Sequence, residues 1–293
     1  MVDSRLDPEG FMKLSIICAT LGPLSEVDSL IHSIIRALRR TNSNICAEFI
    51  LVDQSKDPTE LCFQISDWLN LIHIRNAARG LSLNRNIGLD RASGDWVMLI
   101  DSDCLISEDY FQNFIELMRA HPNIDHFIGR ILDPYYANPL FREWPCITRR
   151  IWKPMLWYYA TSVNSIFKVN DDMQRFDENF GLGARYGSSE DIDFFLRLKA
   201  KRLYTPKLII LHPDIFQTEL SARKIDSYSY GFGALCAKHV LPLGIIIMLA
   251  SLLKKAADVL RGRSTPNELA RATAFRLRGF WTYLSNRIQG GHV

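Results

Sequence analysis

The apolar run at residues 96–100 ends directly in two carboxylates, Asp101 and Asp103, which are separated by Ser102. A short, continuous apolar run of this kind indicates a strand covered on both faces, as in a parallel sheet. Polar groups that follow such a strand lie at the edge of the sheet where α/β proteins bind their ligands. Two carboxylates one residue apart can bind a divalent cation together. The run therefore predicts a parallel α/β sheet with a ligand site at its edge.

Expected strands and helices alternate through the first 125 residues. The strands are expected at 13–20, 48–52, 71–74 and 96–100, and the helices at 26–40, 60–69, 81–92 and 109–119. This alternation is typical of an α/β fold with a doubly wound, mostly parallel sheet and helices on both faces. Beyond residue 125 the pattern becomes irregular and rich in Pro, Trp, Tyr and Arg, which is typical of specificity loops. Further strands are expected at 126–131 and 208–211, and a helix at 190–199.

Charge is divided unevenly along the chain. Residues 254–293 contain eight Lys/Arg and two Asp/Glu, a balance of +6, whereas the other 253 residues contain 27 basic and 30 acidic groups, a balance of −3. A basic tail favours contact with an anionic surface such as phospholipid. Nucleic-acid binding is not expected, because no basic stripe runs through the body of the chain. The six cysteines form no C-x-x-C pair and the N-terminus has no apolar signal segment, so a reduced, cytoplasmic protein is expected.

Four segments together resemble family 2 glycosyltransferases with the GT-A fold, of the bacterial surface-polysaccharide type. They are KLSIICAT from residue 13, EFILVDQS from residue 48, RGLSLNRNIGLDRASGDWVMLIDSD from residue 79 and GSSEDIDFFLRLKAK from residue 187. The resemblance covers roughly residues 12–240 and implies a catalytic domain at 12–225, with a nucleotide-binding half at 12–125 and an acceptor-binding half at 126–225. Residues 226–293 are then expected to form a helical tail that can associate with a membrane.

The resemblance implies donor-binding roles for four residues of the first half. Thr20 would hold the base, and Asp53, at the end of the second strand, would hold uracil or ribose. Arg85 would pair with the diphosphate or orient the loop of Asp101, since a guanidinium fork matches two phosphate oxygens. Asn86 would bond the nucleotide. Each has a structural alternative: Thr20 and Asp53 are also common capping or turn residues, and Arg85 could be a solvated residue on an amphipathic helix.

The resemblance also implies a metal site and a catalytic base. Asp103 would ligate Mg²⁺ or Mn²⁺ directly, with Asp101 nearer the ribose and sugar, and the cation would neutralise the diphosphate leaving group. His212, after the apolar run 208–211, is a further candidate ligand, although a lone histidine after a strand is often structural. Asp191 is the first candidate for the base that deprotonates the acceptor, and Glu190 is the second. Acidic residues are also favoured at a helix N-terminus for purely structural reasons.

The apolar stretch at 241–253 is only thirteen residues long, whereas a membrane-spanning helix needs about 20. The mixture of arginines and aromatic residues that follows, at 270–284, suits an interfacial element. The alternative is a helix packed on the catalytic domain. Peripheral attachment to the inner face of the cell membrane is therefore expected.

The expected function is an inverting, metal-dependent glycosyltransferase. It would move a sugar from a nucleotide-diphosphate sugar, with UDP by analogy, to a hydroxyl of a glycan or lipid-linked acceptor in polysaccharide assembly. One alternative is an enzyme like a sugar-nucleotide pyrophosphorylase, but residues 19–23 lack the Gly-rich basic loop that it would need. A second is a non-catalytic nucleotide-sugar binding module, which the intact acidic pairs oppose. A dinucleotide oxidoreductase is not expected, because no G-x-G-x-x-G follows the first strand.

Overall fold

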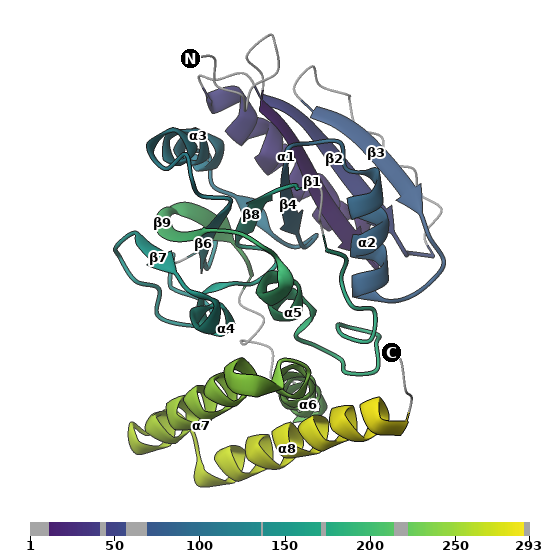
Figure 1. Cartoon of the computed structure of the whole chain (residues 1–293). Coiled ribbons are helices and arrows are strands. Elements are labelled where there is room, and N and C mark those ends of the chain that lie inside the picture. The colour runs from purple at the N-terminus through teal and green to yellow at the C-terminus, as the bar shows by residue number, and fades with distance from the viewer. Residues whose placement is uncertain are drawn as a thin grey trace.

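A computed structural model describes residues 12–41, 45–56, 69–135, 137–170, 174–213 and 222–289. Its described strands form one sheet in the order β3-β2-β1-β4-β8-β6-β9-β5, and β7 pairs with β9 beside this path (Figure 1). The first four strands are parallel: β1 (Met12–Thr20), β2 (Ile45–Asp53), β3 (Leu69–Arg75) and β4 (Trp96–Ile100). The expected strands at 13–20, 48–52, 71–74 and 96–100 are confirmed.

The second half of the sheet mixes strand directions. β8 (Ser165–Lys168) runs antiparallel between β4 and β6 (His126–Leu132), and β6 is parallel to β9 (Arg202–Leu211). β5 (Leu105–Ile106) and β7 (Arg149–Ile151) are antiparallel to β9. β5, β7 and β8 were not expected from the sequence, and β9 begins six residues before the expected 208–211. Its earlier part, residues 202–207, reads RLYTPK and so contains two basic residues and a proline, which hide the strand from an apolar pattern.

Helices cover both faces of the sheet, as the apolar spacing predicts. α1 (Leu24–Arg40) and α3 (Tyr110–Ala120) contact one another on one side of the sheet, to its left in Figure 1, whereas α2 (Leu81–Arg91) lies on the other side, to the right. α4 (Leu156–Tyr159) and α5 (Glu190–Arg197) follow in the second half. The expected helix at 60–69 lies outside the described residues except for Leu69, which begins β3.

Three further helices form a layer beside α4 and α5 (Figure 1): α6 (Ala222–Lys238), α7 (Ile245–Leu260) and α8 (Pro266–Gln289). α6 and α8 cross closely, because Gly233 lies against the backbone of Arg276, where a Cβ atom would come 1.9 Å from the carbonyl oxygen. Lys238 and His239, at the end of α6, each lie 2.9 Å from the buried carboxylate of Asp193 in α5. These contacts join the helical layer to α5. Among the described residues, the structure contains no helix with the length and apolar character needed to cross a membrane.

Candidate active site

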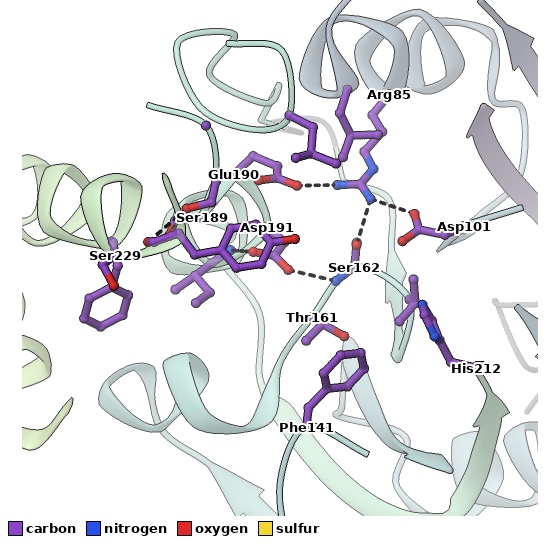
Figure 2. Close-up of a pocket in the computed structure, with 18 of the residues that line it drawn as sticks. Arg85, Asp101, Phe141, Thr161, Ser162, Ser189, Glu190, Asp191, His212 and Ser229 are labelled. Atoms are coloured by element: carbon purple, nitrogen blue, oxygen red, sulfur yellow. Dashed lines mark hydrogen bonds and ion pairs between the residues drawn. The ribbon is translucent and has the colours of Figure 1, made fainter. Parts of the chain in front are cut away.

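A cavity of about 450 Å³ opens between the end of β4 and the start of α5 (Figure 2). It is lined by residues of the first half, the second half and the helical layer. Five residues singled out from the sequence line it, namely Arg85, Asp101, Glu190, Asp191 and His212. The fold therefore brings together one cation and four potential acid, base or metal-ligating groups that lie up to 127 positions apart in the chain, from 85 to 212.

Arg85 links the two halves of this cavity. It is only 3% exposed, so its interpretation as a solvated helix residue is wrong. Its guanidinium donates to Asp101 Oδ1 at 3.1 Å, Ser162 Oγ at 2.9 Å and Glu190 Oε1 at 3.1 Å (Figure 2). Burial opposes its charge, but Asp101 and Glu190 outweigh that effect and raise the pKa of Arg85. Arg85 is thus a permanent cation that holds the loop after β4 against the start of α5.

Glu190 and Asp191 share the N-terminus of α5 but have different surroundings. Burial, followed by the neighbouring Asp191 charge, raises the pKa of Glu190 to about 7, although Arg85 opposes the shift. Burial also raises the pKa of Asp191. Asp191 accepts hydrogen bonds from the backbone N–H groups of Ile192, at 2.8 Å, and Ser162, at 3.3 Å. Within the described residues Asp191 forms no direct ion pair, so its carboxylate can accept a proton without first leaving a cation.

The segment between Phe180 and Gly187 borders the cavity. Leu182 and Gly187 line it, and the carbonyl of Leu182 accepts from the backbone N–H of Leu81 at 3.1 Å. Gly181 has a φ of 103°, and a Cβ atom there would lie 2.8 Å from Ser82 Oγ, so only glycine lets the segment approach the start of α2 this closely. The segment is therefore held against the start of α2, at the border of the cavity.

Asp103 and His212 form a candidate metal site, with Cys104 beside them. One ligand atom from each of the three residues lies within 4.8 Å of the others, and His212 Nε2 is 3.7 Å from Asp103 Oδ1. His212 Nδ1 lies 2.7 Å from the carbonyl of Pro213, which can only accept, so Nδ1 donates this hydrogen bond and Nε2 is the ring nitrogen that faces Asp103. Burial, together with Asp101, raises the pKa of Asp103.

This donor set fits a hard divalent cation. Mg²⁺ and Mn²⁺ prefer carboxylate oxygens, and Mn²⁺ also accepts imidazole. Burial, Asp101 and Asp103 raise the pKa of the Cys104 thiol well above its usual value, which keeps it protonated and unsuited to ligate such an ion. The protein ligands that fit are therefore Asp103 and His212, with Asp101 two residues away and bound to Arg85.

Thr20 and Asp53 lie at neighbouring strand ends, outside the residues that line the cavity. They are paired in the register of β1 and β2. Thr20 Oγ1 donates to Ser102 Oγ at 3.2 Å and accepts from the N–H of Gly22 at 2.9 Å. Burial would raise the pKa of Asp53, but hydrogen bonds from Ser55 and His73 outweigh it, so this pKa is lowered. Asp53 is therefore ionised at the end of β2, but its side chain is fully buried and already bonded to Ser55 and His73, so its contact with a nucleotide stays a prediction.

Asn86 does not line the cavity, and its amide is already occupied. Its Oδ1 accepts from the N–H of Phe176 at 2.7 Å, and its Nδ2 donates to the Phe176 carbonyl at 3.0 Å and to Glu178 at 3.1 Å. These bonds hold the segment that leads to Gly181. The contact of Asn86 with a nucleotide stays a prediction, since the structure gives this side chain a positioning role.

Several lining residues were not anticipated from the sequence. Ser162 carries no motif, yet its backbone and side chain meet Asp191 and Arg85. Arg142 lies in the segment rich in Pro, Trp, Tyr and Arg, whose composition was the available signal. Tyr228, Ser229 and Arg276 come from α6 and α8, for which the sequence indicated contact with the core only as an alternative.

Comparison with known proteins places this geometry among glycosyltransferases. Residues 15–176 match the family described as Glycosyl transferase family 2. An uncharacterized glycosyltransferase of Haemophilus influenzae is 23% identical over 197 residues, 66% of this chain and 64% of the relative. A putative polypeptide N-acetylgalactosaminyltransferase 13 of Drosophila melanogaster is 30% identical over 117 residues, 36% of this chain and 21% of the relative. The chain thus spans less than two thirds of the length of either relative.

The solved structures that resemble this chain share its fold. The crystal structure of Staphylococcus aureus TarS 1–349 has a TM-score of 0.56 at 16% identity and covers 95% of this chain and 92% of TarS 1–349. The complex of that protein with UDP has a TM-score of 0.55, also at 16% identity and with the same coverage. The complex with UDP-GlcNAc has a TM-score of 0.51 at 14% identity, again with the same coverage.

Proposed function

Because the chain belongs to glycosyl transferase family 2, as the match over residues 15–176 shows, we propose that it is an inverting glycosyltransferase. It transfers a sugar from a nucleotide-diphosphate sugar to an acceptor hydroxyl. The observation that carries this proposal is the single cavity in which Asp191, without a direct ion pair among the described residues, faces the Arg85–Asp101 pair. A single available base opposite the proposed donor-binding edge suits an inverting reaction, in which the acceptor oxygen displaces the diphosphate in one step.

In the proposed mechanism the donor lies along the ends of β1, β2 and β4. The ionised Asp53 accepts from uracil or ribose, Thr20 contacts the base, and Asp101 lies near the ribose and sugar. UDP is the proposed nucleotide, since the TarS structures of the same fold include complexes with UDP and UDP-GlcNAc. A divalent cation held by Asp103 and His212 would neutralise the diphosphate.

Asp191 is the proposed general base. Its carboxylate removes the proton of the acceptor hydroxyl as the oxygen attacks the anomeric carbon, and the bond to the diphosphate breaks. Glu190 stays paired with Arg85, which keeps the base and the donor loop at a fixed separation. The pairing makes Asp191, rather than Glu190, the group available for proton transfer.

A donor screen tests this function. The full chain is incubated with a panel of UDP-sugars and Mg²⁺ or Mn²⁺, and nucleotide release is measured with and without candidate glycan acceptors. We expect release of UDP from at least one donor, above the level in EDTA. Binding of a donor with no release under any condition would favour a non-catalytic module. Formation of UTP, a nucleoside triphosphate, from the UDP-sugar and added pyrophosphate would favour a pyrophosphorylase-like enzyme.

We also propose that the helical layer attaches the enzyme to the cytoplasmic face of a membrane, near a lipid-linked acceptor for polysaccharide assembly. α6 packs on the part of the chain that contains the sheet. α7, in contrast, exposes a row of apolar side chains at helical spacing, namely Ile245, Ile246, Leu249, Leu253 and Leu260. Lys254 and Lys255 interrupt this row, but each is paired with an acidic residue, Asp258 and Glu268, so the excess of positive charge lies on the arginines of the layer. Each basic residue near an anionic surface contributes about 1 kcal/mol. The described cysteines, all unpaired, support a reducing compartment.

Liposome co-sedimentation checks this attachment. Leu249→Gln with Leu253→Gln should strongly reduce sedimentation with anionic vesicles, because these side chains are 56% and 71% exposed and insert without unfolding the protein. The matched control is Ile147→Gln, because Ile147 is a comparably exposed apolar residue, at 63% exposure, that lies outside the helical layer. Wild-type binding should weaken at high salt. Vesicle binding that is equal in the double variant and the control would contradict attachment through α7.

A further inference from the structure

A second cavity, of about 200 Å³, adjoins the first on the side of Asp191. It lies between α4, the segment before β7 and the helices α7 and α8. Phe141, Arg142 and Arg276 line both cavities, so the second cavity is the immediate neighbour of the first on the side of the helical layer. Most of the remaining wall comes from two residues of α4, Trp157 and Tyr158, and from two residues of α7, Lys254 and Lys255.

Arg142 brings a cation into this space without a carboxylate partner. Its guanidinium lies 5.0 Å from the ring centre of Trp144 and 5.4 Å from that of Tyr158. Within the described residues it forms no ion pair. Burial lowers the pKa of Arg142 to about 10, although Tyr158 and Asp191 oppose the shift, so it remains charged at neutral pH. A partly buried cation that rests only on aromatic rings is one that an anion would stabilise.

Arg276 of α8 is the second such cation. Its guanidinium lies 5.2 Å from the ring centre of Phe232 and donates to Ser251 Oγ at 3.2 Å. Its Nε atom is buried and has no hydrogen-bond partner. It too forms no ion pair among the described residues. The hydrogen-bonding capacity of the Arg276 guanidinium is therefore not fully used within the described protein.

The other charged groups of this cavity are already paired. Lys254 Nζ lies 2.9 Å from Asp258, and Lys255 Nζ lies 3.5 Å from Glu268. Arg85, across the first cavity, is bound to two carboxylates. In the part of the chain that the structure describes, Arg142 and Arg276 are therefore the two cations lining this cavity that have no carboxylate partner.

We propose that Arg142 and Arg276 bind a phosphate group of the acceptor, so that the transferase acts on a phosphorylated acceptor. This inference rests on the glycosyl transfer proposed above and names the acceptor class of that site. Guanidinium groups suit phosphate because their N–H groups match its oxygens in pairs. Trp157 and Tyr158 provide an apolar wall for the part of the acceptor next to the phosphate. The phosphate is carried either by a soluble glycan or by a lipid.

The position of the two arginines favours the acceptor over the donor. The proposed donor diphosphate lies at Asp101, Asp103 and His212, where a divalent cation would balance its charge. Arg142 instead lines the same cavity as the proposed base, Asp191, and lines the adjoining cavity as well. The acceptor hydroxyl must reach Asp191 in the first cavity, so a phosphate elsewhere on the acceptor would lie in the adjoining cavity.

Calorimetric titration of the full chain, saturated with UDP and Mg²⁺, tests the proposal. The probes are glycerol 1-phosphate as the soluble phosphate, octyl phosphate as the lipid-like phosphate, and octyl glucoside as the neutral control. We expect at least one phosphate to bind and the neutral probe not to. Arg142→Gln and Arg276→Gln should each weaken binding by about tenfold or more, the effect of losing a charge-assisted hydrogen bond. Arg278→Gln, an exposed arginine on the same helix as Arg276, should not change it.

Arg142→Lys keeps the charge and should restore part of the affinity. Tighter binding of octyl phosphate assigns the phosphate to a lipid, and equal binding assigns it to a soluble chain. Absence of phosphate binding by the wild type, or equal binding by the glutamine variants, would overturn the proposal. Equal losses of UDP and phosphate affinity in Arg142→Gln would also overturn it, because they would indicate general damage. Nucleotide release is measured separately, so failure of the acceptor site and failure of the transferase activity are distinguishable.

Discussion

Replacing Asp191 by asparagine is expected to lower turnover by ~10²–10⁴, the usual contribution of a general base. The amide keeps the shape of the side chain but cannot take up the acceptor proton. Donor affinity should change little, because the proposed donor contacts lie at the other side of the cavity. Steady-state turnover and UDP binding of the full-length variant check both parts. Glu116→Gln, an exposed carboxylate on α3, is the matched control and should behave as wild type.

The pH dependence of turnover should follow the ionisation of the pair Asp191 and Glu190, and substitutions then identify which of the two is the base. Both have raised pKa values, Glu190 near 7, so the pair should take up a proton as the pH falls below about 7 and turnover should fall with it. A base must be deprotonated to act, which fixes the sign of this change. Removal of the Asp191 charge should lower the pKa of Glu190. If Asp191→Asn keeps near wild-type turnover while Glu190→Gln is inactive, the base is Glu190.

The parallel half of the fold could be predicted because its strands are covered on both faces. Trp96–Ile100 is buried at every position, which is why its apolar run is unbroken and its end at Asp101 is recognisable. The antiparallel strands leave a weaker signal. β5 has two residues and β7 has three, too few for any periodicity, and their pairing with β9 joins segments distant in the chain. Such pairings depend on tertiary packing and not on local sequence.

The individual residues of the site could be predicted from the sequence, but their contacts in space could not. Arg85 stood in a recognisable segment, yet its burial and its bond to Glu190, 105 positions away, depend on the packing of α2 against α5. Asp193 shows the reverse case. No role was predicted for it from the sequence, yet it is fully buried and bound by Arg197, Lys238 and His239. Burial opposes its ionisation, but His239, Lys238 and Arg197 outweigh burial and lower the pKa of Asp193 to about 2.

Replacement of Asp103 by alanine should remove nearly all turnover and most of the metal-dependent binding of UDP. A bound cation supplies several kcal/mol of charge stabilisation at a phosphoryl oxygen. Each 1.4 kcal/mol, approximately, is a factor of ten in rate, so the loss should be about 10² or more. The fold should survive, because the Asp103 side chain is one third exposed and its ion-pair contact with His212 is 3.7 Å long. Circular dichroism and a thermal melt check that survival.

Asp95→Ala is the matched control, since Asp95 is an exposed carboxylate that precedes the same strand, β4, at the opposite edge of the sheet. It should retain wild-type turnover and metal dependence. Titration of Mn²⁺ in the presence of UDP gives the second measurement, and His212→Ala should weaken this metal-dependent binding without the complete loss expected for Asp103→Ala. Wild-type turnover that persists in excess EDTA would contradict the metal site. In that case Arg85, as the only permanent cation bound to the loop of Asp101 among the described residues, would be the group left to balance the diphosphate charge.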